Sequence, residues 1–306
     1  MQAVADQLHS LAVSPDRDLA PRDFKSDLAP IWCHGCGDFG VLSALFKALS
    51  VCNLDPTRTV ILSGIGCSSR LPGFVAAYGF HGVHGRVLPT ATGVKSARPD
   101  LNVFGVGGDG DGYSIGGGHL PHAARRNPDM TYLIMNNNTY GLTKGQVSPT
   151  SMVPLASVGA RIDPKRWKTT PYGNTEDAIN PIAQAIACDC SFVARGFSYK
   201  PNQLADILVE AIRHRGFSLV DVFSPCPTFN QDQTDEFYRQ KTYDVPAEHD
   251  PTDRVKAFAL ACDTVGYPLG IIYRRSDKPG ILDEQAALRK RLHGLGSMPE
   301  LIKRFE

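Results

Sequence analysis

Residues 101–112 have the sequence LNVFGVGGDGDG, in which a short apolar run passes directly into a glycine-rich turn that contains two aspartates. The apolar run, residues 101–106, predicts a buried strand, and residues 113–126 predict a helix after the turn. Backbone N–H groups at the start of such a helix bind phosphate well, because they are unpaired and lie at the positive end of the helix dipole. This stretch therefore predicts a phosphate-binding turn at the end of a strand.

The two aspartates of this turn, Asp109 and Asp111, indicate what kind of phosphate it binds. Gly105, Gly107 and Gly110 match the G-x-G-x-x-G pattern of dinucleotide sites, which is a weak signal on its own. Carboxylates inside the turn repel a diphosphate unless a divalent cation lies between them. The turn therefore favours a diphosphate held through a metal; a turn that serves only tight packing, with its acids in solvent, is the alternative.

The end of the next predicted strand also favours a metal. Residues 131–135 predict this strand, which leads into Asn136, Asn137 and Asn138, whereas a dinucleotide site has an acidic residue there for the ribose. A carboxamide oxygen is a good ligand for Mg²⁺. Adjacent parallel strands would bring Asp109 and Asn137 to neighbouring carboxyl ends of the sheet, so we expect a magnesium site between them.

The first 225 residues alternate between apolar runs and helical periodicity, which is typical of a sheet with helices on its faces. We expect a doubly wound α/β fold with a mostly parallel sheet. Helices are predicted at residues 41–51, 89–97, 113–126, 181–187 and 201–213, and strands at 59–64, 101–106, 131–135, 191–194 and 217–223. Three parts are expected: an N-terminal arm (1–29), a cofactor-binding domain (30–226), and an irregular C-terminal extension (227–306) that contacts another subunit and contains one helix at 254–265.

The composition disfavours several classes of partner. The 306 residues carry a net charge of +1, which gives no general attraction to nucleic acid or to an anionic membrane. Residues 1–25 have no apolar core, and no stretch approaches the roughly 18 apolar residues of a membrane span. We expect a cytoplasmic protein with no nucleic-acid or membrane partner.

Four of the eight cysteines lie where a metal centre could form. Cys33 and Cys36 have the C-x₂-C spacing that zinc sites, redox dithiols and iron–sulfur clusters share. Cys67 and Cys226 each follow a predicted strand in a loop, whereas the other four have the surroundings of buried structural thiols. We expect Cys33, Cys36, Cys67 and Cys226 to bind a [4Fe–4S] cluster; purely structural cysteines and a zinc site are the alternatives.

Six motifs together resemble the β subunit of the 2-oxoacid:ferredoxin oxidoreductases. They are Cys33-His-Gly-Cys-Gly37, Gly64-Ile-Gly-Cys-Ser-Ser69, His84-Gly-Arg86, Gly107-Gly-Asp-Gly-Asp-Gly112, Tyr140-Gly-Leu-Thr-Lys-Gly-Gln146 and Ser224-Pro-Cys226. The resemblance covers about residues 30–275, and residues 79–86 and 142–146 look most like the 2-oxoglutarate branch. Asn136 departs from the pattern, which has Asp there.

The resemblance implies a thiamine-diphosphate-binding fold, of which this chain provides the diphosphate domain. It implies that Asp109, Asn137 and the backbone carbonyl of Thr139 hold Mg²⁺, and that the four cysteines above hold the [4Fe–4S] cluster. Contacts to thiamine diphosphate are implied for Ser68, Ser69, His84, Gly108, Gly110, Asp111, Gly112, Tyr140, Gly141 and Leu142. Thiamine activation in this family uses a Glu, and the sequence contains none before Glu176. We therefore expect an α subunit with the pyrimidine-binding domain to supply it, in an αβ or (αβ)₂ assembly.

The implied activity is reversible oxidative decarboxylation of 2-oxoglutarate with coenzyme A to succinyl-CoA and CO₂, with electrons passed one at a time to ferredoxin. The alternatives are the same chemistry on pyruvate or a broad range of 2-oxoacids, and a cluster-free thiamine-dependent decarboxylase or synthase. Candidate substrate contacts are His81, Arg86 and Lys144, of which the first two could instead support their loop. Lys144 could bind the distal carboxylate of 2-oxoglutarate or be solvated.

Overall fold

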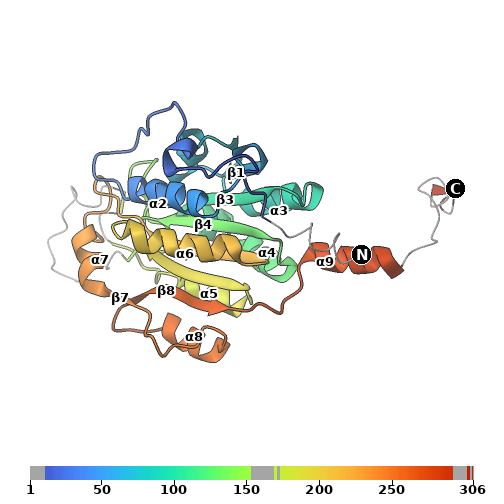
Figure 1. Cartoon of the computed structure of the whole chain (residues 1–306). Helices are drawn as coiled ribbons and strands as arrows, with labels where there is room; N and C mark the ends of the chain where they lie inside the picture. Colours follow the sequence, from blue (N-terminus) through green and yellow to red (C-terminus); the bar gives the residue numbers. More distant parts are fainter. Residues whose placement is uncertain (1–10, 153–168, 171–172, 292–301, 304, 306) are drawn as a thin grey trace, which may run out of the picture.

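The computed structural model describes residues 11–152, 169–170, 173–291, 302–303 and 305 of the chain. Within these residues, eight strands form one sheet in the order β2-β1-β3-β4-β6-β5-β8-β7 (Figure 1). Every neighbouring pair is parallel except β5 and β8. The strands are β1 Thr59–Ser63, β2 Tyr78–His81, β3 Asn102–Gly108, β4 Met130–Asn136, β5 Phe192–Phe197, β6 Phe217–Phe223, β7 Thr242–Asp244 and β8 Tyr267–Arg274.

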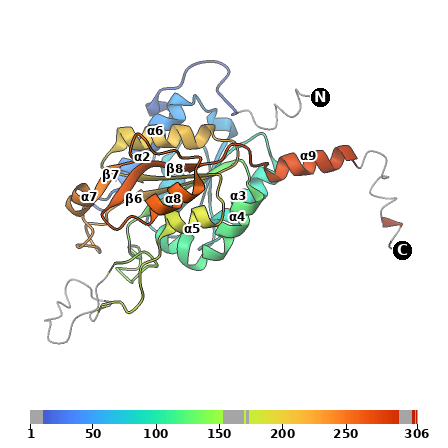
Figure 2. The same cartoon turned by 90° about the horizontal axis from the view of Figure 1, so that it is seen from below.

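Helices cover both faces of the sheet, as the two views in Figures 1 and 2 show. Helices α2 and α6 pack on one face, and α3, α4, α5 and α8 pack on the other, each set with its own apolar core. Helix α9 projects away from the sheet in both views. The helices are α2 Asp38–Val51, α3 Val87–Ala97, α4 Leu120–Arg126, α5 Pro181–Ala187, α6 Pro201–Arg213, α7 Asp235–Lys241, α8 Arg254–Ala261 and α9 Ile281–Arg291.

Strand β4 shows why the sheet is buried on both faces. All its residues are buried; Leu133 and Met135 belong to one core, whereas Tyr132 and Ile134 belong to the other. Successive side chains of a strand point to opposite faces, so a continuous apolar run fills both cores. The doubly wound, mostly parallel α/β fold predicted from the sequence is confirmed.

The predicted helix at residues 113–126 is not one continuous helix. A π-helix, η4 (Gly110–Ile115), and a short 3₁₀ turn, η5 (Gly117–His119), precede α4. Three consecutive glycines, 116–118, separate η4 from α4, and glycine is the poorest helix former after proline. The helix predicted at 254–265 likewise ends earlier, at Ala261.

The extension after Pro227 is more regular than the sequence indicated. It contains α7, β7, α8, β8 and α9, and β8 joins the sheet beside β5, where Gly270 pairs with Arg195. Pro268 and Gly270 lie within β8. Because both residue types normally interrupt strands, this strand was not predicted from the sequence. Strand β2 was missed as well, because its four residues are exposed at the sheet edge and lack apolar alternation.

Several loops meet at one edge of the sheet because their strands are parallel. Gly108 pairs with Met135, and Asn136 pairs with Phe223, so β3, β4 and β6 end side by side. The glycine-rich turn, the asparagine run and the loop with Cys226 therefore share this edge. Residues 1–10 of the predicted arm, and residues 153–168 and 171–172, lie outside the described part. In the part that is described, no helix combines the length and apolarity needed to cross a membrane.

Candidate active site

The carboxyl edge of the sheet contains a cavity of about 220 Å³. Its walls come from the ends of β1, β3 and β4, the strands that the sequence motifs follow. The residues that line it are Ile65, Gly66, Cys67, Ser68, His84, Gly108, Asp109, Gly110, Asp111, Asn137, Thr139, Tyr140, Gly141, Leu142 and Thr143. The cavity thus brings together residues from four separate motifs, and both proposed side-chain ligands of magnesium face it.

Asp109 is a buried carboxyl group at the end of β3, with 1% of its surface exposed. Burial raises its pKa to about 6, and hydrogen bonds from Ser148 and Thr150 and a backbone N–H of Asn137 only partly oppose this rise. The hydroxyl of Thr150 donates to Asp109 Oδ2 across 2.7 Å. A carboxylate held in this way, in a cavity shared with other oxygen donors, suits a bound cation.

Asn137 and Thr139 lie in the turn that follows β4. The backbone N–H of Thr139 donates to Asn137 Oδ1 across 3.1 Å. Asn138, between them, has a φ of 55°, in the left-handed region that asparagine tolerates better than most residues. This turn puts Asn137 and Thr139 on the cavity wall together and turns Asn138 into the protein.

Asp111, in contrast, holds two loops in place. Its Oδ1 accepts hydrogen bonds from the backbone N–H groups of Ile65 and Gly85, at 2.9 and 2.8 Å, and from His84 Nδ1 at 2.8 Å. A Cβ on Gly64 would lie 2.2 Å from this carboxyl group, so only glycine permits the approach. Asp111 therefore joins the loops after β1 and before α3 to the glycine-rich turn.

Most of the remaining predicted cofactor contacts also line the cavity, and two do not. Ser68 lies behind Gly108, where an added Cβ would be 3.3 Å from its Oγ, and Tyr140 donates from its hydroxyl to the carbonyl of Gly110 across 3.2 Å. Gly112 packs against Tyr132 and Ile134, and Ser69 is fully buried; neither lines the cavity.

The four predicted cluster cysteines come from three segments that hydrogen bonds join to one another. Cys33 and Cys36 lie in one turn, closed by the N–H of Cys36 donating to the carbonyl of Cys33 across 3.0 Å. The N–H of Gly37 donates to the carbonyl of Pro225, and Trp32 Nε1 donates to that of Cys67. The C-x₂-C turn is thus attached to the loops that carry Cys67 and Cys226.

The thiols of these cysteines are close enough to influence one another. Burial raises the pKa of Cys67 to about 11, with Asp38, Cys226 and Cys33 adding to the rise, and burial also raises the pKa of Cys36 and of Cys226. Cys33 is exposed. Among the described residues, no three His, Cys, Asp or Glu side chains converge on one ion. The structure thus brings the loops of the four cysteines together, and its described residues show no formed metal site.

Gly141 lies where Cys67, Cys226 and the turn that contains Asn137 meet. A Cβ on Gly141 would be 3.7 Å from the Sγ atoms of both Cys67 and Cys226 and 3.5 Å from Nδ2 of Asn137. Cys67 also lines the cavity that contains Asp109. The cysteine group and the proposed cofactor cradle are therefore directly adjacent.

The three candidate substrate contacts differ in position. The ring of His81 bonds through Nδ1 to the carbonyl of Ser69 at 2.9 Å and lines a neighbouring groove rather than the cavity itself. Arg86 donates hydrogen bonds to the carbonyls of Gly85 and Ile115 and lines neither the cavity nor the groove. Lys144 is exposed and does not line the cavity. None of the three is placed toward the proposed diphosphate site.

Two buried groups near the site were missed in the sequence. Asp38 directly follows the C-x₂-C-G motif, and burial raises its pKa to about 6, with Ser224 Oγ donating to its Oδ1 across 2.6 Å. Thr150 belongs to the polar loop Ser148-Pro-Thr-Ser151, all of whose hydroxyl residues are buried. A run of Ser and Thr is the only signal that this loop gives, and such runs are far more often exposed.

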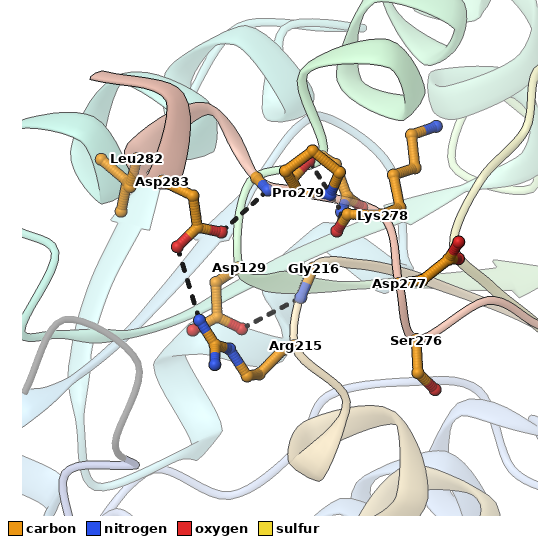
Figure 3. Close-up of a pocket in the computed structure, with 11 residues that line it drawn as sticks. Asp129, Arg215, Gly216, Ser276, Asp277, Lys278, Pro279, Leu282 and Asp283 are labelled. Carbon is orange, nitrogen blue, oxygen red and sulfur yellow. Dashed lines mark hydrogen bonds and ion pairs between the residues drawn. The ribbon is translucent and has the colours of Figure 1, made fainter. Parts of the chain in front are cut away.

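A cavity at the opposite edge of the sheet, also about 220 Å³, is of another kind (Figure 3). It lies where β6 begins and β8 leads into α9. Arg215 Nη2 lies 3.4 Å from Asp283 Oδ1, and the N–H of Gly216 donates to Asp129 Oδ1 across 3.5 Å. The first contact joins α9 to the loop before β6, the second joins the loops before β6 and β4, and none of the sequence motifs includes these residues. The candidate active site is therefore the carboxyl edge.

The residues at this edge fit both a magnesium ion and a diphosphate. Carboxylate, carboxamide and carbonyl groups supply only oxygen donors, as Mg²⁺ requires. Gly108, Gly110 and Gly141 lie on the wall, where an added Cβ would meet the neighbouring side chains of Ser68, Tyr140 and Asn137. The fit thus rests on both the donor chemistry and the shape of the cradle.

Comparisons with known proteins agree with this geometry. The family described as "Thiamine pyrophosphate enzyme, C-terminal TPP binding domain" matches residues 64–222, and the family of the C-terminal part of the pyruvate ferredoxin oxidoreductase β chain matches residues 226–290. The first match contains the glycine-rich turn and the asparagine run. The second contains Cys226 and much of the extension.

Individual relatives are similar over most of the chain. A 2-oxoacid:ferredoxin oxidoreductase β subunit of Aeropyrum pernix is 39% identical over 93% of this chain and 92% of its own length. A 2-oxoglutarate oxidoreductase subunit KorB of Mycobacterium tuberculosis is 43% identical over 74% of this chain and 58% of its own length. A structure of 2-oxoglutarate:ferredoxin oxidoreductase from Magnetococcus marinus, with 2-oxoglutarate, coenzyme A and succinyl-CoA bound, is 41% identical, with a TM-score of 0.89 over 97% of this chain and 99% of that one.

Proposed function

The chain belongs to the β subunits of the 2-oxoacid:ferredoxin oxidoreductases, and from this membership we propose that, with an α subunit, it catalyses oxidative decarboxylation of 2-oxoglutarate. Coenzyme A takes up the acyl group as succinyl-CoA, CO₂ is released, and ferredoxin accepts the electrons. The similarity to proteins named for 2-oxoglutarate supports this substrate. The proposed cytoplasmic location rests on the sequence alone.

One observation carries the proposal: Cys67 lines the same cavity as Asp109 and Asn137. A simple thiamine-dependent decarboxylase has no need for thiols at this position, whereas an oxidoreductase that transfers single electrons does. The adjacency of Cys226 to the same cavity wall, through Gly141, supports the same conclusion. We therefore favour the cluster-containing enzyme over a cluster-free decarboxylase or synthase.

In this proposal, Asp109, Asn137 and the carbonyl of Thr139 hold Mg²⁺, and the glycine-rich wall accommodates the diphosphate. When bound, thiamine diphosphate supplies the nucleophilic carbon for the keto group and the electron sink for loss of CO₂. This chain's Asp109, which is buried at the cavity wall, and Asn137 orient the cofactor through its metal. The Glu that activates the aminopyrimidine comes from the α subunit.

The [4Fe–4S] cluster is proposed to bind to Cys33, Cys36, Cys67 and Cys226. Hydrogen bonds between the segments that carry these residues keep the segments together, and Cys33 gives the group an exposed edge. Burial raises the pKa of the other three thiols, so the free thiols are protonated and binding of iron must release protons. An exposed edge at Cys33 suits electron transfer to ferredoxin.

The test is to produce this chain with a candidate α subunit under anaerobic conditions and to assay it with 2-oxoglutarate, pyruvate and a branched 2-oxoacid. We expect coenzyme A-dependent reduction of ferredoxin, fastest with 2-oxoglutarate. Reduction that is equally fast or faster with pyruvate or the branched acid would replace the proposed substrate with a broad or different one. A complex without iron that still releases CO₂ would support the cluster-free alternative.

A further inference from the structure

The C-terminal extension reaches into the metal-binding turn through Tyr238. This residue lies on α7 and is 1% exposed, and its ring stacks on Phe223 with centroids 4.2 Å apart. Its hydroxyl donates a hydrogen bond to Oδ1 of Asn138. Because the ring is held by stacking, the hydroxyl has a fixed direction, toward the turn between Asn137 and Thr139.

Asn138 is in turn connected to Asp109 through Thr150. Its Nδ2 donates to the backbone carbonyl of Thr150 across 2.7 Å, and Thr150 in turn donates from its hydroxyl to Asp109. Asn138 also holds the left-handed backbone conformation that orients its two neighbours. The side chain of Asn138 therefore links Tyr238 to Asp109, through Thr150, and to the turn that carries Asn137 and Thr139.

Asn230 makes a second connection from the extension. It is fully buried, and its Nδ2 donates to the carbonyl of Asn137 across 3.0 Å. Its Oδ1 accepts the N–H groups of Asp232 and Gln233, and its own N–H donates to the carbonyl of Cys226. Asn230 thus touches the metal turn and the cysteine loop at the same time.

These contacts are more specific than packing requires. Apolar side chains would bury α7 against Phe197 and Phe223 without any cost of desolvating polar groups. Instead, buried polar groups from residues 230–238 meet polar groups of the turn with matched donors and acceptors, an arrangement that fixes one conformation.

We propose that residues 230–238 of the extension hold the turn from Asn137 to Thr139 in its metal-binding conformation, and that Tyr238 and Asn230 are positioning residues for Mg²⁺ and hence for the diphosphate. The inference rests on the proposed magnesium and thiamine diphosphate site. It gives the extension a role at that site, because a turn that is already in place loses less conformational freedom when the ion binds.

The test compares Tyr238→Phe with Tyr243→Phe in the complex with the α subunit. Tyr243 is a matched control, because it also lies in the extension and also donates from its hydroxyl to a side chain, Asp263, away from the turn. After removal of metal with EDTA, Mg²⁺ is titrated at fixed thiamine diphosphate, and cofactor binding is followed by protein fluorescence and circular dichroism. The thermal unfolding of each metal-free complex is measured in parallel.

For Tyr238→Phe we expect the Mg²⁺ concentration at half-maximal cofactor binding to rise about five-fold, the scale of one hydrogen bond, with full binding recovered at saturating Mg²⁺. Tyr243→Phe should bind as the wild type does. Equal Mg²⁺ dependence of Tyr238→Phe and wild type would overturn this inference and leave the proposed function standing. A wild-type complex that binds no thiamine diphosphate in response to Mg²⁺ would overturn the proposed function as well.

A second variant guards against a folding defect. Asn138→Gly keeps the left-handed backbone conformation, which glycine adopts freely, and removes the side chain that joins Tyr238 to Thr150. We expect a weakening of Mg²⁺ binding at least as large as that of Tyr238→Phe. Unchanged Mg²⁺ binding in a folded Asn138→Gly complex would contradict the proposed role of the extension even if Tyr238→Phe did not fold.

Discussion

The hydroxyl of Thr150 donates a hydrogen bond of 2.7 Å to Oδ2 of Asp109, although 41 positions separate the two residues. Both are buried, and the carbonyl of Thr150 is held in turn by Asn138. A carboxylate that is oriented by such a neighbour presents its other oxygen in one direction, which favours metal binding over free rotation.

Replacing Thr150 by Val tests this orientation with little change of shape. We expect Thr150→Val to raise the Mg²⁺ concentration needed for cofactor binding about ten-fold, since groups that orient metal ligands have effects of that order. Thr57→Val is the matched control, because Thr57 donates to Asp55 Oδ1 across the same 2.7 Å at an exposed position. Titration of the EDTA-treated complexes with Mg²⁺ measures the effect, and identical curves for both variants would contradict it.

Replacing Asp109 by Asn separates the effect of this residue on cofactor binding from its effect on the stability of the fold. We expect EDTA to release thiamine diphosphate from the wild type, and Asp109→Asn to retain none in Mg²⁺, as measured by cofactor content after gel filtration. Burial raises the pKa of Asp109, so the ionised carboxyl group destabilises the metal-free fold, and metal-free Asp109→Asn should unfold at the same or a higher temperature. Asp100→Asn, a surface change, should keep the cofactor. Full retention by Asp109→Asn would show that our metal ligand is wrong.

Two exposed cysteines allow a matched test of the cluster. Cys33 and Cys262 are both exposed, and only Cys33 belongs to the proposed ligand group. We expect Cys33→Ser to lose most iron and acid-labile sulfide and the broad visible absorption that dithionite bleaches, while Cys262→Ser keeps them. Iron content and absorbance of anaerobically purified protein are the measurements. Full iron in Cys33→Ser, or equal loss in both, would remove Cys33 from the ligand set.

Replacing Lys144 by Ala tests whether this residue causes a preference for a dicarboxylic substrate. Its side chain is exposed in a loop next to the cavity, and we expect Lys144→Ala to lower kcat/KM for 2-oxoglutarate about ten-fold, with a smaller loss for a monocarboxylic 2-oxoacid. Lys241→Ala, at another exposed lysine, controls for loss of positive charge. Steady-state kinetics with both substrates decides the question, because equal losses on the two acids rule out a contact with the distal carboxylate.

From the burial of His214 we predict how the free energy of unfolding changes with pH. Burial, and then Arg274, lower its pKa to about 4, and its Nε2 lies 2.8 Å from Ser191 Oγ in a buried setting that favours the neutral ring. Below about pH 6.5 the unfolded chain binds a proton that the folded chain does not, so stability falls as pH drops toward 4, by at most about 1.4 kcal/mol per pH unit. His214→Gln should lessen this fall between pH 7 and 5 in urea unfolding. A variant with the same slope as the wild type would show that other groups cause it.

Much of the fold could be predicted because the signals are local. A buried parallel strand such as β4 must be apolar throughout, and the helices Pro181–Ala187 and Pro201–Arg213 begin at a proline that suits the first helical turn. The elements that were missed depend on distant partners. Strand β8 is a strand because it pairs with β5, although Pro268 and Gly270 argue against it locally.

By itself, the sequence determined the chemistry: an Asp and an Asn after adjacent strands, glycines where a diphosphate needs space, and four cysteines in loops. These residue types carry their own donor properties, so they could be recognised before any geometry was known. Only the tertiary structure decided how they are oriented. It turned Asp111 toward two loops and left Arg86 and Lys144 off the cavity wall. It also brought Thr150 to Asp109, and Tyr238 and Asn230 to the turn at residues 137–139. Hydrogen-bond direction depends on contacts between segments far apart in the chain, and no local pattern specifies those contacts.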